Sequence, residues 1–345
     1  MTKPGWRFLI AMMWCVAATT PLHAQSPVDS LKTFSDFPSL KLDRLFAGEI
    51  FTERGALMNF PNGISGQTCF FVPASAETTA ARLQTWDPSP HAELKVYGFR
   101  FLKSPADLED FRGLSFQSGQ HPVRWLMDKI VTTTDSKSEL NLTRAEAQAL
   151  AACTGRRADP ANAATCWTKL LLDRATQFQR NALTGIPPYE LPGPTAVPVE
   201  QLRAMLLEQA SITHEFAPIL QAIGLLGTKP APNFTPVWYW TFFEADHHGA
   251  VALGAVYKLQ VGDHYQLADV EYYVSNSYQT AVTLYEVWPM ESGGTPGALV
   301  WRGDYFAAPM LAFTKGAERI AYGALMLQDI KKEVRCFQDS LKGKQ

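Results

Sequence analysis

The last hundred residues carry the most regular pattern of hydrophobic and polar positions in the chain. Four apolar, β-rich runs cover 248–260, 265–275, 280–288 and 298–305. Turn residues separate the first three, among them Gly262 with Asp263 and the stretch 275–277, as in antiparallel hairpins, and a loop at 289–294 precedes the fourth. Residues 318–341 change to a spacing of three or four, which is typical of an amphipathic helix. The apolar stripe of that helix comprises Ile320, Ala324, Leu327, Ile330, Val334, Phe337 and Leu341.

The first two thirds of the chain add strands and then helices. Residues 67–73 and 93–101 have strand composition, and 74–86 forms a short helical pattern that begins after Ser75. From about 120 to 225 the pattern is mostly helical. One predicted helix, 142–152, opens with the capping-box signature of Thr143 and Glu146, and another covers 199–219. We therefore predict an α+β fold, in which an antiparallel sheet packs against the long C-terminal helix. Residues 25–345 form one domain in this interpretation, and the middle helices are an insertion or a layer on the sheet.

Two stretches resemble the START-like, helix-grip superfamily, which includes polyketide-cyclase and lipid-transfer proteins. After the strand, Pro73–Glu77 (PASAE) opens a helix that ends at Trp86-Asp87-Pro88, and the late meander runs into a long terminal helix. The resemblance covers residues 65–101 and 248–341, and the helical stretch between them departs from the minimal family pattern. It implies a curved sheet wrapped round the last helix, with an apolar ligand cavity between the two.

The N-terminus has the pattern of a cleaved secretory signal. Lys3 and Arg7 precede the apolar run 8–20, and Leu22-His23-Ala24 fits a cleavage site. The run is too short to span a bilayer. We predict that residues 1–24 are removed and that the mature chain is exported, periplasmic or extracellular, without a membrane span.

Cysteine usage agrees with export. Four cysteines lie outside the signal segment, and an even number in an oxidising compartment favours disulfides. Cys153 and Cys166 flank a polar loop between two helical patterns, so we predict that they pair. For Cys69 and Cys336, a disulfide and two separate buried thiols are both open. No cysteine or histidine spacing matches a zinc or haem site, so the sequence predicts no metal and no cofactor.

Charge and motifs exclude several function classes. The net charge is −2, and no clustered basic face indicates a nucleic-acid partner. Phosphate loops, dinucleotide fingerprints and serine-hydrolase elbows do not occur in the chain. Whether the protein is an enzyme is therefore open on sequence grounds.

The richest polar cluster directly follows an aromatic run. It consists of Glu244, Asp246, His247 and His248. Carboxylates beside histidines can bind metals or transfer protons. Neighbouring residues of a strand point to opposite faces, however, so His247 and His248 cannot easily serve one site. The alternative is a polar strand entrance without a chemical role.

Aromatic side chains are spread along the meander. We take Trp240, Tyr257, Tyr273, Tyr285 and Trp301 as candidate ligand-binding residues, because such side chains commonly line ligand cavities. Strand alternation also predicts that Tyr272 and Tyr273 face opposite sides of the sheet. The same residue types are also ordinary sheet-face and core residues, which is the more common role of any single one.

Three functions are consistent with these patterns. The first is an exported protein that binds a hydrophobic small molecule or lipid between the sheet and the last helix. The second is a structural or interaction protein of the cell envelope. The third is a hydrolase or isomerase that uses the histidine and carboxylate groups of residues 244–248.

Overall fold

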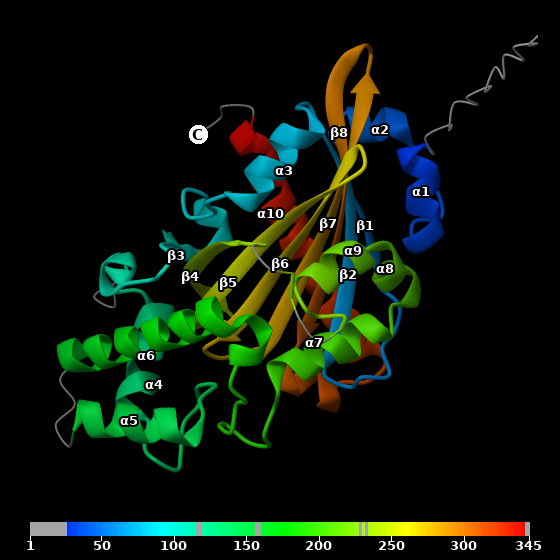
Figure 1. Cartoon of the computed structure of the whole chain (residues 1–345). Coiled ribbons are helices and arrows are strands. Elements are labelled where there is room, and N and C mark those ends of the chain that lie inside the picture. Colours follow the sequence, from blue (N-terminus) through cyan, green and yellow to red (C-terminus); the bar gives the residue numbers. More distant parts are fainter. Residues whose placement is uncertain (1–25, 115–118, 156–159, 228–229, 232–233, 342–345) are drawn as a thin grey trace, which may run out of the picture.

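The computed structural model describes residues 26–114, 119–155, 160–227, 230–231 and 234–341. Its centre is an antiparallel sheet of eight strands in the order β1-β2-β8-β7-β6-β5-β4-β3 (Figure 1). The strands are β1 (Phe51–Arg54), β2 (Gly63–Val72), β3 (Val96–Leu102), β4 (Val237–Ala245), β5 (His248–Val261), β6 (His264–Val274), β7 (Thr280–Ser292) and β8 (Thr295–Ala307). The predicted α+β class is confirmed.

Two helices cover one face of this sheet. The long helix α10 (Ala317–Leu341) packs on β1 and β2, and α3 (Ala76–Gln84) lies over β5 to β8. Three residues of α10 are buried against the strands of this face: Ile330, Val334 and Phe337. The C-terminal half of the predicted apolar stripe therefore faces the sheet, as expected. Ile320 at its start is half exposed. A Cβ on Gly66 of β2 would clash with Leu327, which shows how closely the helix approaches the strand there. We call this side of the sheet the α10 face.

The helices between β3 and β4 cover the opposite face (Figure 1). They are α4 (His121–Thr132), α5 (Arg144–Thr154), α6 (Pro160–Asn181), η3 (Ala182–Gly185), α7 (Pro198–Leu207), α8 (Ala210–Glu215) and α9 (Ala217–Ala222). Helix α1 (Pro27–Phe34) joins them, and α2 (Leu42–Phe46) packs near β2. Apolar side chains of this layer and of the strands form the larger hydrophobic core. The predicted capping box of α5 is present, with Thr143 and Glu146 exchanging two hydrogen bonds.

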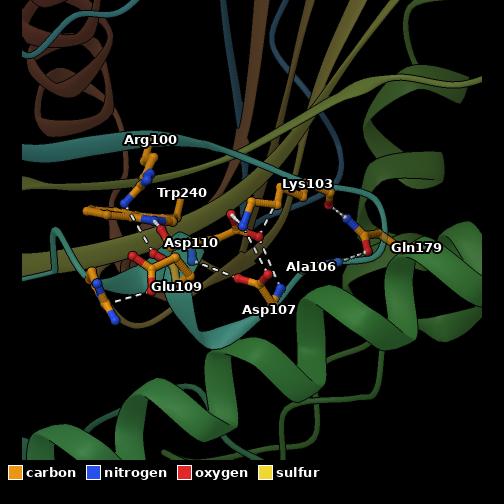
Figure 2. A network of polar contacts seen from close by, with 9 residues as sticks. Arg100, Lys103, Ala106, Asp107, Glu109, Asp110, Gln179 and Trp240 are labelled. Atoms are coloured by element: carbon orange, nitrogen blue, oxygen red, sulfur yellow. Dashed lines mark hydrogen bonds and ion pairs between the residues drawn. The ribbon is translucent and has the colours of Figure 1, made fainter.

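A polar network ties the helical layer to the edge of the sheet (Figure 2). The turn η2 (Leu108–Phe111) follows β3, and Asp110 is buried there. Its carboxylate accepts the backbone N–H of Lys103 and of Asp107, at 3.2 and 3.0 Å. Its carbonyl accepts the indole N–H of Trp240 at 2.8 Å. Gln179 of α6 accepts the backbone N–H of Ala106 and donates to the carbonyl of Lys103, just before this turn. The network is structural, because it satisfies buried backbone groups.

Three boundaries differ from the sequence prediction. The hairpin of β7 and β8 continues through 289–292, where a loop was predicted, and only Gly293-Gly294 form its turn. Both glycines have positive φ, which suits a tight two-residue turn. Helix α6 begins at Pro160, inside the predicted loop, because proline is well suited to the first turn of a helix. Residues 199–219 form three short helices rather than one.

Tyr272 and Tyr273 do not face opposite sides, which corrects the prediction from alternation. The register of β5 with β6 shifts between Leu253 and Gly254, so that one extra residue of β6 is inserted. Such a bulge breaks the period of two. Both tyrosine rings therefore enter the core under the helical layer, where Tyr272 stacks on Phe178 at 3.8 Å.

The four cysteines among the described residues form one disulfide and leave two free thiols. Cys153 and Cys166 form the predicted disulfide between α5 and α6. Cys69 and Cys336 are free and buried, and they lie on opposite faces of the sheet. Within the described residues, every helix is too short or too polar to cross a bilayer. The predicted signal segment, 1–24, lies outside the described residues.

Candidate functional site on the α10 face

The five aromatic candidates do not form one site. Trp240, Tyr257, Tyr273 and Trp301 are buried in the core beneath the helical layer. Tyr285 is buried on the α10 face instead. The indole N–H of Trp240 is held by the Asp110 carbonyl and that of Trp301 by Gln67, at 2.8 and 3.2 Å. These two tryptophans therefore act as core residues with satisfied polar tips.

The polar cluster at 244–248 is a hairpin turn. Asp246 and His247 both have positive φ and connect β4 to β5 as a two-residue turn of the kind that suits a hairpin. Glu244 accepts hydrogen bonds from Lys95 and from the Tyr97 hydroxyl. The His247 side chain is 89% exposed, and the His248 ring stacks on Trp125 at 4.2 Å. His247 Nδ1 lies 3.5 Å from Glu244 Oε1, whereas the His248 ring contacts Trp125, so the two histidines do not serve one site.

The α10 face carries a different polar cluster, which the sequence reading missed. We define it as the carboxyl cluster, comprising Asp269, Glu271, Arg302, Asp304 and Glu333. Asp269 and Glu271 lie on β6, Arg302 and Asp304 on β8, and Glu333 on α10. In register, Asp269 of β6 faces Thr283 of β7, which faces Asp304 of β8. The three strands therefore present one continuous polar row.

Arg302 is the single cation of this cluster and holds two of its carboxylates. Its guanidinium donates to both Asp304 oxygens at 2.8–3.0 Å and to Glu333 at 2.8 Å. It also lies 5.5 Å from the centre of the Tyr285 ring. The Thr283 hydroxyl completes the shell of Asp304 at 2.9 Å. Since Arg302 and Asp304 are buried, this pairing compensates much of their desolvation cost.

Asp269 and Glu271 are held by tyrosines rather than by cations. The Tyr239 hydroxyl donates to Asp269 at 2.9 Å, and the Tyr278 hydroxyl donates to Glu271 at 2.5 Å. Tyr239 reaches Asp269 across β5 because Gly254 lies beneath its ring. A Cβ at that glycine would come within 2.1 Å of the ring. The absence of a side chain at Gly254 thus determines where the Tyr239 hydroxyl lies.

These two carboxyls titrate near neutrality. Burial, followed by the charge of Glu271, raises the pKa of Asp269 to about 8. Burial and the charge of Glu333 raise the pKa of Glu271 to about 7, against the hydrogen bond from Tyr278. Burial also raises the pKa of Asp304, against the neighbouring Arg302 charge. At neutral pH, Asp269 is therefore mainly protonated and can donate a hydrogen bond.

Solvent still reaches part of this region. Three residues of this region are half-buried: Asp269, Glu271 and Thr283. Protein atoms surround their polar groups, but part of each residue remains accessible to water. Half-buried aromatic rings flank them. Phe243 and Phe306 contact Tyr278, with ring centres 6.4 and 5.6 Å apart, and Phe99 stacks on Tyr239 at 5.5 Å. The region thus combines ionisable groups with apolar walls, as ligand sites do.

Two surface hollows lie outside this region. One, of about 500 Å³, is lined by residues 131–134 around the end of α4 and by residues 151, 152, 154 and 155 around the end of α5. The other, of about 340 Å³, lies between the start of α3 and the β7–β8 hairpin. Ser75 and Glu291 are among the few polar side chains at the second hollow. Neither hollow gathers ionisable groups comparable to the carboxyl cluster.

A histidine–carboxylate pair lies under the helical layer. His264 Nε2 is 2.9 Å from Glu286 Oε1, and Glu286 is fully buried. Gln266 bonds the other oxygen of Glu286 at 3.1 Å. The hydrogen bond to Glu286 raises the pKa of His264, and burial raises that of Glu286 to about 7. His264 sits by the β5–β6 turn, far along β5 from His248, so the two histidines share no site.

The sequence did contain a signal for the carboxyl cluster. Asp269 and Glu271 stand two residues apart in an otherwise apolar strand (LADVEYYV), and so do Arg302 and Asp304 (VWRGDYF). Charged residues at a period of two share one face of a strand. Two such pairs on strands of the same meander indicate a polar patch on one face of the sheet.

Comparisons with known proteins give no relative for this chain. No protein-family model, no curated protein and no solved structure matches it significantly.

Proposed function

We propose that this protein binds a small molecule on the α10 face, beside helix α10. The ligand has an apolar or aromatic body and at least one hydrogen-bonding group that meets the carboxyl cluster. This proposal keeps the hydrophobic ligand suggested by the family resemblance and adds a polar contact on the ligand. The flanking rings of Phe99, Phe243 and Phe306 provide the apolar walls.

The charge balance of the cluster is the observation that carries the proposal. The cluster has four carboxyl groups and one guanidinium, which binds Asp304 and Glu333. Asp269 and Glu271 have tyrosine hydroxyls instead of cations as partners. Crowded carboxyls with raised pKa values are costly to the fold, and such groups concentrate at functional sites. Apolar residues would stabilise this face of the sheet better. A ligand that donates hydrogen bonds to the cluster compensates the cost in the bound state.

The arrangement of elements supports the family resemblance. A strand, helix α3, the meander and the terminal helix follow in the order of helix-grip domains, and both helices lie on the same face of the sheet. The helical layer covers the other face. A ligand site beside α10 therefore agrees with what the resemblance implies. Export, which the Cys153–Cys166 disulfide favours, makes an extracytoplasmic ligand part of the same proposal.

Native mass spectrometry of the protein from an exporting host tests this function. We expect an added mass that organic extraction releases and identifies. The double variant Asp269→Asn/Glu271→Gln should lose this mass, because it removes both ionisable groups while it preserves shape. The matched control is Asp135→Asn, on the exposed loop after α4. An unliganded wild type, also after incubation with a host lipid and metabolite extract, would contradict the proposal.

A second candidate is acid–base catalysis by the same cluster. The pKa values near 8 and 7 are the observation that favours it, because a general acid or base works best near its own pKa. In this case the compound in the extract should be converted by the wild type. Asp269→Asn would bind the compound but not convert it. Conversion by the Asn variant at the wild-type rate would exclude a catalytic role for Asp269.

The envelope-interaction function has less support. It requires a broad exposed apolar patch on the helical segment. Among the described residues of 142–220, Leu207 is the large apolar side chain with high exposure, at 67%. A single exposed leucine does not form such a patch.

A further inference from the structure

Three side chains of different chemistry converge beside helix α10, about one helical turn beyond Glu333 of the carboxyl cluster. They are His91, Glu93 and Cys336, and one donor atom of each lies within 4.8 Å of the other two. Cys336 Sγ is already 3.3 Å from Glu93 Oε1. A tetrahedral ion with bonds of about 2.0–2.3 Å separates its ligand atoms by about 3.5 Å. Small side-chain rotations therefore bring all three donors to coordination distance.

Two packed elements hold these donors. His91 and Glu93 belong to the η1 turn (Ala92–Leu94) and its N-cap, which contacts α10. Cys336 is buried on α10, one residue before Phe337. The Trp86 ring lies next to both elements. Its centre is 6.0 Å from that of the His91 ring and 5.7 Å from that of the Phe337 ring. The thiol side is therefore shielded while Glu93 stays open to solvent.

We propose that His91, Glu93 and Cys336 form a binding site for a borderline divalent cation of the zinc type. A thiolate, an imidazole and a carboxylate are the ligands that Zn²⁺ and Co²⁺ accept together, whereas Ca²⁺ and Mg²⁺ require oxygen ligands. Three protein ligands leave the fourth position to water. Because the ligands come from η1 and α10, the ion links the segment before β3 to the terminal helix.

The contrast with Cys69 supports this assignment. Both thiols are free, but Cys69 lies on the opposite face in the apolar core. The two cannot form a disulfide with each other across the sheet. Cys336 instead has an imidazole and a carboxylate as neighbours, both outside the apolar core. A buried thiol needs no such neighbours for packing alone.

Cobalt substitution tests the site. The purified protein, kept reduced at its free thiols without cleavage of the disulfide, is titrated with Co²⁺ and then with Zn²⁺. We expect one equivalent to produce the near-ultraviolet charge-transfer band of a cobalt thiolate, together with tetrahedral visible bands, and Zn²⁺ to abolish them. Cys336→Ser should lose the charge-transfer band. His91→Ala and Glu93→Gln should each weaken binding by at least about tenfold.

Matched controls separate the site from other cysteines and histidines. Cys69→Ser removes the second free thiol, and His247→Ala removes a highly exposed imidazole. Both should titrate like the wild type. Circular dichroism of each variant verifies folding, and Glu93→Gln, at an exposed position, gives a result if Cys336→Ser fails to fold. No thiolate band in the wild type, the same band in folded Cys336→Ser, or unchanged affinity in Glu93→Gln would overturn the proposal.

Discussion

Replacing Asp269 by asparagine should stabilise the protein, and the gain should increase with pH. Asparagine keeps the shape of the side chain and an oxygen that accepts the Tyr239 hydrogen bond. It removes only the ionisation. In the folded protein the pKa of Asp269 is raised to about 8 from its ordinary 3.8, mainly by burial. The folded state therefore retains a proton that the unfolded chain releases.

The sign and the size of the stability change follow from this difference in pKa between the folded and the unfolded chain. Because the unfolded state binds fewer protons between pH 3.8 and pH 8, the stability of the wild type falls as the pH rises through this window and levels off above it. The difference of about four pH units sets an upper limit of about 5 kcal/mol. Solvent access to the half-buried residue and local relaxation reduce the expected gain to about 1–2 kcal/mol at pH 8. Near pH 4 it is about zero.

Urea denaturation of the wild type and of Asp269→Asn at pH 4.5, 6, 7 and 8.5 measures this effect. The free energies of unfolding should diverge with pH in favour of the variant. Asp135→Asn, at an exposed loop position, should show no such divergence. A constant difference across the series, or a variant that is less stable at pH 8.5, would refute the reasoning. It would mean that Asp269 is ionised in the folded protein.

Three further predictions concern packing and covalent structure. Gly254→Ala should lower the melting temperature, at a cost of about 1–3 kcal/mol, because the new methyl displaces the tyrosine ring above it. Gly113→Ala, whose methyl meets ordinary contacts at 3.5 Å, is its control, and equal melting of both would contradict this. Replacing Cys153 and Cys166 together by serine opens a loop with a sequence separation of 13 and should cost about 2–3 kcal/mol in urea denaturation. An unchanged midpoint would show that the bond constrains the unfolded chain little. Arg174→Ala leaves the half-buried carboxylate of Glu146 and two tyrosine faces without their cation, and we expect a loss of about 2–4 kcal/mol by chemical denaturation. A loss below about 1 kcal/mol would contradict this.

Much of the fold could be predicted from local patterns. The β5–β6 hairpin followed from alternation and from Gly262 with Asp263, and the start of α5 followed from its capping box. These are properties of neighbouring residues. The bulge that brings Tyr272 and Tyr273 into the same core was not predictable, because it depends on the register between β5 and β6. Tertiary packing determined that register.

The candidate site was harder to predict for the same reason. The richest polar cluster in the sequence was at residues 244–248, where polar groups are adjacent in the chain. The structure uses this stretch as a turn. The carboxyl cluster instead brings together β6, β8 and α10, and the donor set at Cys336 joins a turn to a residue more than two hundred positions later. The spacing of two places each charged pair on one face of its strand. It does not show that β6, β8 and α10 come together, or that the η1 turn meets Cys336.

The two faces of the sheet differ in a way that bears on function. The face under α4 to α9 is filled by large apolar side chains. On the α10 face, the apolar pattern ends on two strands. Along β6, apolar Leu267 is followed on this face by Asp269. Along β8, apolar Val300 is followed by Arg302, one row from Asp269. A sheet covered only for stability would continue the apolar pattern, since buried ion pairs rarely stabilise better than packed hydrophobic groups. The charged residues that replace apolar ones on β6 and β8 therefore indicate where on the α10 face a ligand should be sought.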